Sequence, residues 1–363
     1  MARGGYPCLS LFSPHVYSID SSALCRYTPV MKMRVAIALA VIVGFLLSAG
    51  CGGKEERGPA PAESTRLKLA VIPKGTTHEF WKSIHMGALM AAEEFDVDII
   101  WKGPQKEDDR AQQITVIEDF ISRGVDGIVL APLDERALCR PVQDAVRENI
   151  PVVVIDSGMQ GSDYISYVAT DNYKGGVMAA RRLAQLLQNK GRIFLIRYQE
   201  GSASTTQREQ GFLDTIKAEA PAISLLVQDQ YAGTTTESAY QLAENLISRF
   251  PDVDGVFCPN ESSTFGTLRA LQETGLAGKI VFIGFDSSPK LVQALRDGHI
   301  QGLIVQNPVR MGYLGVKLMT LHLRGQPIDK VIDTGVYIAT RDNIDDPEIR
   351  SLLLPDFSKY PNI

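Results

Sequence analysis

Short apolar runs recur along the chain from residue 67 onward, separated by longer stretches that mix apolar and polar residues. Most of these runs are nearly continuous in Val, Ile, Leu and Phe, which is typical of strands buried on both faces of a parallel sheet. The intervening segments, such as 81–95 and 109–122, are long enough for crossover helices, so the alternation predicts an α/β protein. Ten strands are expected at 67–73, 97–101, 127–131, 151–155, 165–169, 192–197, 223–228, 255–259, 280–284 and 300–305.

The number of predicted strands indicates two sheets rather than one. Open sheets usually hold roughly four to six strands, and ten are too many for a comfortable single sheet. We therefore expect two doubly wound, Rossmann-like lobes, each built on a parallel sheet. The change from one lobe to the other is expected near residues 169–171, after which 172–188 begins a new helix.

The first 66 residues differ in pattern from the rest of the chain. Lys32 and Arg34 precede an apolar stretch at 35–47, which is shorter than the ~20 residues of a membrane span and suits a signal-peptide core. Small residues at 48–50 then lead to Cys51, so the segment resembles a bacterial lipoprotein signal with lipid attached at Cys51. We expect a leader and signal peptide over 1–50 and a flexible tether over 51–66, rich in Gly, Pro, Ala and charge. An ordinary signal peptide followed by an incidental cysteine is the alternative.

Composition and charge narrow the class of function. The chain has 363 residues, of which 45% are hydrophobic and 22% charged, close to the averages of soluble globular proteins. A formal net charge of −5 argues against nucleic acid as a partner. The five cysteines, at positions 8, 25, 51, 139 and 258, show no metal-binding spacing, so no metal site is expected. Motifs of nucleotide-binding, P-loop, serine-hydrolase and zinc-protease sites are missing, so we expect no cofactor and no enzymatic activity.

Polar and aromatic side chains follow the carboxyl ends of several predicted strands, which is where doubly wound sheets bind ligands. Together these side chains suit a polyol such as a sugar. Carboxylates accept hydrogen bonds from neighbouring hydroxyls, Arg supplies a rigid pair of donors, and Asn and Gln both donate and accept. Aromatic rings pack on the apolar faces of a sugar ring. The candidate ligand-binding residues are Lys74, Phe80, Trp81, Asp156, Arg208, Tyr231, Asn260, Asp286 and Gln306.

Several of these residues also have a simpler interpretation. Asp156 and Asp286 could cap helices that follow their strands. Arg208 could be a surface residue paired with Glu209 or Asp214. Phe80 and Trp81 could be core residues of the helix that they begin.

Two further positions near the first strand have a structural reading. Thr76 and Glu79 match a capping box at the start of a helix. His78 is expected to face solvent, and Lys74 to be an exposed bystander if the ligand is a neutral sugar.

An ordered series of segments resembles the sugar-binding proteins of ABC importers, the ribose-binding type of the type I periplasmic binding protein fold. The series covers about residues 67–340 and includes AVIPKGTTHEFWKSIHMGA, SRGVDGIVLAPLD, VVVIDSG, ATDNYKGG, REQGF, VFCPNESSTFGTLRALQ, VFIGFDSSP and GLIVQNP. In this resemblance Phe80 and Trp81 match stacking aromatics, and Tyr231 matches a further aromatic. The hydroxyl-binding positions match Asp156, Arg208, Asn260, Asp286 and Gln306. The segment IPK and the pair Asp156–Ser157 look like the autoinducer-2 branch, in which Lys74 would contact the ligand.

The resemblance implies two lobes joined by a three-segment hinge, with the ligand buried between them on closure. The N-terminal lobe is expected at 67–169 plus 307–334, and the C-terminal lobe with its tail at 170–306 plus 335–363. It further implies a lipid-anchored monomer in the periplasm or at the cell surface that delivers a monosaccharide, a pentose or a hexose, to an ABC permease and ATPase. Autoinducer-2 or a sugar acid is the alternative ligand, and a receptor kinase is the alternative partner.

Overall fold

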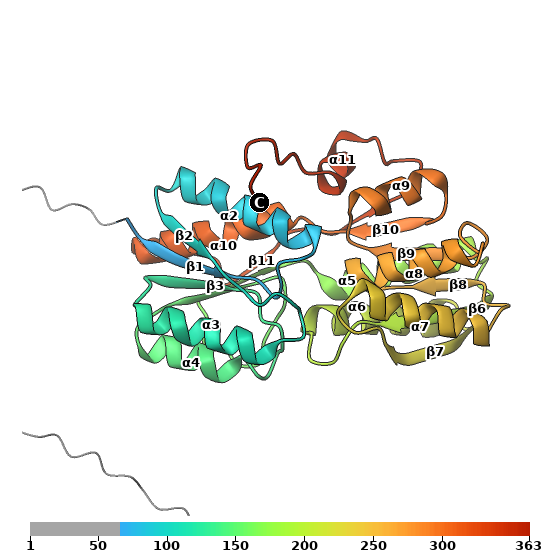
Figure 1. Cartoon of the computed structure of the whole chain (residues 1–363), viewed down its shortest axis with the longest axis horizontal. Helices are drawn as coiled ribbons and strands as arrows, with labels where there is room; N and C mark the ends of the chain where they lie inside the picture. Colours follow the sequence, from blue (N-terminus) through green and yellow to red (C-terminus); the bar gives the residue numbers. More distant parts are fainter. Residues whose placement is uncertain (1–65) are drawn as a thin grey trace, which may run out of the picture. The chain divides into compact units, whose positions relative to one another are not determined.

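The structure, a computed structural model, describes residues 66–363, which form two six-stranded sheets (Figure 1). The first sheet is parallel throughout and has the order β11-β5-β4-β3-β1-β2. Its strands are β1 (Lys68–Ile72), β2 (Asp98–Trp101), β3 (Gly127–Leu130), β4 (Val152–Ile155), β5 (Ser166–Ala169) and β11 (Val331–Asp333). The expected leader, the lipid attachment at Cys51 and the tether up to residue 65 lie outside the described residues.

The second sheet has the order β12-β10-β9-β8-β6-β7 and is parallel except for β12, which runs antiparallel to β10. Its strands are β6 (Gly191–Arg197), β7 (Ile223–Tyr231), β8 (Gly255–Phe257), β9 (Val281–Phe285), β10 (Gly302–Val305) and β12 (Tyr337–Ala339). These two sheets with alternating helices confirm the expected fold class. The ten runs expected from the sequence all form strands, and β11 and β12 are additional.

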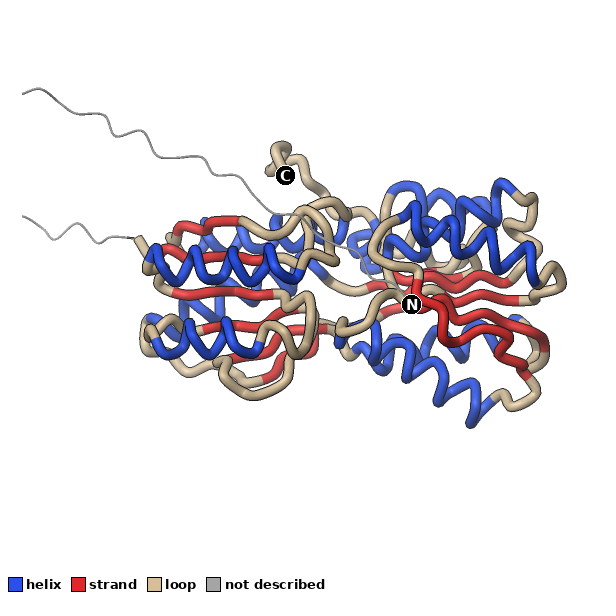
Figure 2. The backbone as a smooth tube through the Cα atoms, turned by 60° about the horizontal axis from the view of Figure 1, so that its bottom comes forward, coloured by secondary structure: helices blue, strands red, loops and turns tan. Residues whose placement is uncertain are grey.

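Helices cover both faces of each sheet (Figure 2). In the first sheet, Leu69 and Val71 point to one face, while Ala70 and Ile72 point to the other. We call this sheet and its helices the first lobe. One face packs on α2 (Glu79–Glu94) and α10 (Pro308–Leu323), and the other on α3 (Arg110–Arg123) and α4 (Cys139–Arg147).

The second sheet and its helices form what we call the second lobe. One face packs on α5 (Asn172–Leu186) and α6 (Ala203–Glu219). The opposite face packs on α7 (Thr236–Arg249), α8 (Glu261–Glu273), α9 (Pro289–Asp297) and α11 (Pro347–Leu353). The chain passes between the lobes after β5, after β10 and between β11 and β12.

One prediction about local structure was wrong. Thr76 and Glu79 form no capping box, because α2 begins at Glu79 and its N-cap is His78, whose side chain makes no capping hydrogen bond. In the C-terminal tail, α11 buries Ile349, Leu352 and Leu353 in the core of the second lobe.

Glycines allow the main helix pair on one face of each sheet to pack at close range. A Cβ atom at Gly87 of α2 would lie 1.9 Å from the Val309 carbonyl oxygen, and one at Gly312 of α10 would lie 2.0 Å from that of Ile84. In the second lobe, a Cβ atom at Gly176 of α5 would lie 1.9 Å from the Arg208 carbonyl oxygen. The backbone of α6 therefore reaches its position at Arg208 only because residue 176 has no side chain.

Candidate ligand-binding site

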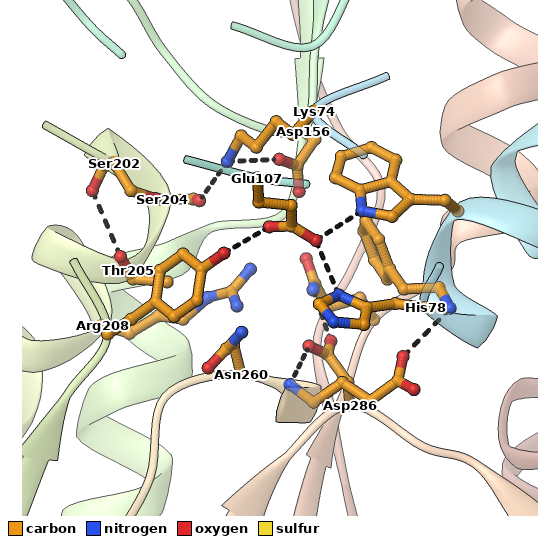
Figure 3. Close-up of a pocket in the computed structure, with 15 residues that line it drawn as sticks. Lys74, His78, Glu107, Asp156, Ser202, Ser204, Thr205, Arg208, Asn260 and Asp286 are labelled. Carbon is orange, nitrogen blue, oxygen red and sulfur yellow. Dashed lines mark hydrogen bonds and ion pairs between the residues drawn. The ribbon is translucent and has the colours of Figure 1, made fainter. Parts of the chain in front are cut away.

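A cavity lies where the carboxyl ends of strands from both lobes meet (Figure 3). Its volume is small, about 30 Å³, well below the roughly 300–1,000 Å³ of sites that hold drug-sized molecules. Side chains from both lobes line it: Lys74, His78, Phe80, Trp81, Glu107, Asp156, Tyr198, Ser202, Ser204, Thr205, Arg208, Asn260, Glu261, Asp286 and Gln306.

Loop residues of the second lobe close one side of this cavity against the first lobe. Gln199 Nε2 donates to the Glu107 carbonyl oxygen at 2.9 Å, and the Glu135 amide donates to the Gly201 carbonyl oxygen at 2.9 Å. Arg110 Nη2 donates to the Glu200 carbonyl oxygen at 2.8 Å. The structure therefore describes a closed arrangement, in which a bound molecule would be surrounded by both lobes.

Eight of the nine residues expected at the site line the cavity; Tyr231 does not. Tyr231 is the last residue of β7, an edge strand of the second sheet, and is 39% exposed. Its hydroxyl accepts a hydrogen bond from Arg197 Nη1 at 2.9 Å, and the guanidinium carbon lies 5.5 Å from the centre of its ring. A residue at the carboxyl end of an edge strand need not face the middle of the sheet, where the cavity lies.

Lys74 is buried, so the expectation that it is exposed was wrong, while its contact with a ligand stays a prediction. Its ammonium nitrogen lies 2.8 Å from Asp156 Oδ2 and donates to Ser204 Oγ of the second lobe at 3.2 Å. Ser157 reaches the same segment, since its Oγ accepts from the Ser204 amide at 3.1 Å. Lys74 therefore neutralises Asp156 and links the two lobes at the cavity wall.

Arg208 is buried on α6 and is not a surface residue paired with Asp214. Its Nε donates to Asn172 Oδ1 at 2.8 Å, and its Nη1 donates to the Pro259 carbonyl oxygen at 2.9 Å. The guanidinium carbon lies 3.8 Å above the Phe285 ring. These contacts fix the direction in which the guanidinium faces the cavity.

Asp286 is held by two donors and does not cap α9, the helix that follows its strand, since Ser288 is the N-cap of α9. Its Oδ1 accepts from Gln306 Nε2 at 2.7 Å, and its Oδ2 accepts from the Glu261 amide at 3.1 Å. Burial raises the pKa of the Asp286 carboxyl.

Asp156 and Asp286 both have positive φ, 63° and 68°, so each side chain projects from a sharp turn after its strand. Asn260 does cap α8, through a bond from the Ser263 amide to its Oδ1 at 3.3 Å.

Phe80 and Trp81 are core residues and cavity residues at once. Both are buried in the cluster between α2 and the first sheet, and both line the cavity. Their rings meet edge to face, with centroids 5.0 Å apart. Both rings therefore lie at the cavity wall although they belong to the core, and their stacking on a ligand stays a prediction.

Glu107 joins three cavity residues (Figure 3). Trp81 Nε1 donates to Oε1 at 2.7 Å, His78 Nδ1 lies 2.6 Å from the same oxygen, and the Tyr198 hydroxyl donates to Oε2 at 2.6 Å. His78 is thus largely buried and not solvent-facing as expected. Burial alone would raise the pKa of Glu107, but the His78 charge and these donors outweigh it and lower the pKa to about 2. Burial likewise opposes the charge of His78, yet Glu107 raises its pKa to about 9.

Glu261 of the second lobe caps the first helix of the first lobe. Its two carboxylate oxygens accept from the amides of Glu79 and Phe80, at 3.3 and 3.2 Å. A carboxylate at a helix N-terminus satisfies free amides and the helix dipole. Burial nevertheless raises the pKa of Glu261 to about 7, against the charge of His78.

The family model described as periplasmic binding protein domain matches residues 69–327. The chain belongs to this family. Among related sequences, the ribose import binding protein of Haemophilus influenzae is 27% identical over 302 residues, covering 83% of this chain and 97% of that protein.

Solved structures of similar proteins include sugar complexes. A carbohydrate transporter solute binding protein from Agrobacterium radiobacter, in complex with D-arabinose, has a TM-score of 0.78 and 32% identity, covering 80% of this chain and all of that one. An ABC transporter solute binding protein from Agrobacterium vitis with bound D-fucose has a TM-score of 0.77 and 34% identity, covering 79% of this chain and all of that one. Both likenesses agree with the two-lobe architecture of this periplasmic binding protein.

Three cavity residues of this periplasmic binding protein, Glu107, Tyr198 and Glu261, are not among the site residues expected from the sequence. Tyr198 directly follows β6, and Glu261 directly follows Asn260, so the strand-end rule applied more strictly would have included both. Glu107 lies six residues beyond β2, and its place in the cavity depends on how the loop 102–109 folds back.

Among residues 66–363, no group of His, Cys, Asp and Glu is arranged to hold a metal ion. Nor does that part of the chain contain a helix long and apolar enough to cross a bilayer.

Proposed function

We propose that this periplasmic binding protein binds a neutral monosaccharide, a pentose or a hexose, between its lobes and delivers it to an ABC importer. The observation that carries the proposal is a cavity in which both lobes supply fixed donors and acceptors beside an aromatic pair. Asp286, Arg208 and Gln306 offer hydrogen bonds from the second lobe, and Phe80 and Trp81 offer flat apolar surface from the first. A relative named for ribose import and solved structures with bound D-arabinose and D-fucose support the ligand class.

The balance of charge in the cavity favours a neutral ligand. Lys74 is paired with Asp156 at 2.8 Å, and His78 with Glu107 at 2.6 Å. The charge of Arg208 acts on the carboxyl of Asp286. Because these cations already face carboxylates, an anionic ligand would have to displace one of those partners.

The burial of Lys74 beside the cavity favours a second candidate ligand, autoinducer-2 or a sugar acid. In that case the ammonium would turn from Asp156 to an oxygen-rich or anionic group of the ligand. The same protein could then present its ligand to a receptor kinase instead of a permease.

A thermal-shift panel separates the ligand candidates. It should contain pentoses, hexoses, inositols, sugar acids and autoinducer-2, followed by calorimetry on every compound that raises the melting temperature. A ligand at 100 times its dissociation constant stabilises the native state by about 2.7 kcal/mol. Stabilisation by a neutral monosaccharide supports the proposal, whereas stabilisation by acids or autoinducer-2 alone overturns it. Delivery of the sugar is tested with the partner ABC permease and ATPase. Their ATP hydrolysis should increase only when both this protein and its sugar are present.

We also propose that the chain is held at a membrane by lipid on Cys51 and works in the periplasm or at the cell surface. The apolar stretch at 35–47, followed by small residues and Cys51, supports this proposal. Cys51→Ser should move the protein from the membrane fraction to the soluble fraction, with Cys139→Ser as the matched control. A wild-type protein that is already soluble, or mass spectrometry that finds cleavage elsewhere, would contradict it.

A further inference from the structure

The carboxylate of Glu107 connects cavity side chains of both lobes. His78 and Trp81 of the first lobe both contact Oε1, at 2.6 and 2.7 Å, while Tyr198 of the second lobe donates to Oε2 at 2.6 Å. Glu107 comes from the loop between β2 and α3, and the two first-lobe partners come from the start of α2. One side chain thus fixes parts of three separate segments.

Glu107 is suited to hold its neighbours rather than to select a ligand. Its side chain is buried, and both of its oxygens are already engaged by protein donors. Tyr198 is kept as a donor, since burial and the Glu107 charge raise the pKa of its hydroxyl. A ligand hydroxyl in the cavity would contact Trp81, His78 and Tyr198, the side chains that Glu107 holds in place.

We propose that Glu107 is a positioning residue, which holds His78, Trp81 and Tyr198 in the arrangement of the closed cavity. The proposal rests on the proposed function, because the positioned side chains are those that would meet the sugar. It implies that Glu107 contributes affinity for any ligand of the cavity and does not distinguish one sugar from another. It also implies that Glu107 keeps His78 charged at neutral pH.

The first experiment compares Glu107→Gln with Glu219→Gln, a control that breaks an exposed ion pair with Arg181 away from the cavity. Calorimetry with two sugars that bind the wild type should show both dissociation constants raised by about ten- to a hundredfold in Glu107→Gln. The ratio of the two constants should stay within about twofold, and the control should bind as the wild type does. Unchanged affinity, or a loss confined to one of the two sugars, would overturn the proposal.

The second experiment needs no ligand and therefore separates failure of this inference from failure of the proposed function. The charged and titratable groups that face His78 are Glu107 from its own lobe and Glu261 and Asp286 from the second lobe. In carbon-labelled protein followed by NMR, His78 should titrate at about 9 in the wild type. In Glu107→Gln the pKa of His78 should fall well below 9, since burial opposes the charge and only Glu261 and Asp286 remain to favour it. A His78 pKa that is the same in both proteins would overturn the inference.

A third variant isolates the contact between the lobes. Tyr198→Phe removes one hydroxyl and keeps the ring, and Tyr231→Phe is its matched control, since Tyr231 lies away from the cavity. Small-angle scattering without ligand should give a larger radius of gyration for Tyr198→Phe than for the wild type and the control. An unchanged radius would show that this bond does not hold the lobes together and would contradict the role given to Glu107.

Discussion

At the scale of single residues, the cavity is built from charged side chains whose partners are already present. Asp286 illustrates this, since Gln306 Nε2 and the Glu261 amide both donate to its carboxylate. A side chain fixed in this way can bind a hydroxyl without first losing rotational freedom. Replacing it should therefore affect binding more than folding.

Asp286→Asn should weaken sugar binding strongly with little loss of stability. The amide keeps the shape of the side chain but loses charge-assisted hydrogen bonds, which are worth roughly 1.5–3 kcal/mol each. We expect calorimetry to show affinity reduced by about ten- to a hundredfold. Asp214→Asn, at a partly exposed position on α6 away from the cavity, is the control. Equal affinity of Asp286→Asn and the wild type would remove Asp286 from the site.

Lys74→Met should destabilise the protein, because Asp156 would be left buried without its cation. Breaking a buried ion pair on one side costs about 3–5 kcal/mol, whereas replacing both partners by apolar groups can be nearly neutral. Chemical denaturation should therefore show a large loss for Lys74→Met and recovery of part of it in the double variant Lys74→Met/Asp156→Asn, because Asn removes the unpaired charge and tolerates the positive φ of 63°. If the double variant is no more stable than the single one, the ion pair is not the reason for the loss.

The residues of the site were predictable to the extent that they directly follow central strands. Lys74, Asp156, Asp286 and Gln306 were found by that rule, and each lines the cavity. Tyr231 also follows a predicted strand, but its strand lies at the edge of the sheet. The order of strands in a sheet cannot be predicted from the local sequence, so this position was not foreseen. Glu107 could not be found, because its position depends on the hydrogen bonds of a loop and not on a repeating pattern.

At the scale of helices and strands, the close packing of two helix pairs, α2 with α10 and α5 with α6, relates the core to the cavity. In each pair, glycines let the two backbones approach. Gly176 of α5 lies against the carbonyl oxygen of Arg208, the residue of α6 that points its guanidinium into the cavity. The spacing between the helices therefore sets the position of a binding residue. Sequence alone indicated the helices, but not which of them approach so closely.

Gly176→Ala should lower both stability and sugar affinity. Extra volume in a packed core costs roughly 1–3 kcal/mol, and here the new methyl group would also displace α6 at Arg208. The matched control is Gly124→Ala at the end of α3, where φ is 64° and no atom lies within 4 Å of the added carbon. That control should lose about 1–2 kcal/mol through backbone strain alone and bind sugar normally. Normal affinity in a destabilised Gly176→Ala would show that α6 does not move.

Ten strands were predictable from their apolar runs, and two short, partly exposed strands were missed. Eight of the ten runs expected from the sequence form inner strands of the two sheets, where continuous apolar runs are buried on two faces, and the other two form the edge strands β2 and β7. β11 and β12 have three residues each and are partly exposed, so their pattern resembles that of a loop. The antiparallel pairing of β12 likewise depends on the return of the chain from the first lobe.

At the scale of the whole molecule, closure of the lobes should depend on pH through Glu261. Its carboxylate lies buried between the lobes in the closed form, where its pKa is about 7, and would return towards the ordinary value of 4.5 in water. A raised pKa means that the closed form binds the proton more tightly, so closure is favoured at low pH and disfavoured as the pH rises from about 4.5 to 7. Glu209 has a similar pKa, but its partners Arg197 and Tyr198 belong to its own lobe.

Small-angle scattering of the ligand-free protein between pH 5 and pH 8 tests this expectation. The radius of gyration of the wild type should increase over this range, and that of Glu261→Gln should not change. A pH dependence that survives in Glu261→Gln would assign closure to another group, and no pH dependence in the wild type would contradict the prediction altogether.

The position of α10 in the first lobe has a consequence for biosynthesis. Met311, Val316 and Met319 of α10 cover the apolar face of α2, yet about 220 residues separate the two helices along the chain. Domains are often completed as they leave the ribosome, at roughly 5–20 residues per second. Here the first lobe stays incomplete until nearly the whole chain has been translated, and α2 exposes its apolar face throughout that time. A holdase or an export factor that recognises unfolded chains therefore has a long interval in which to bind this protein before it folds.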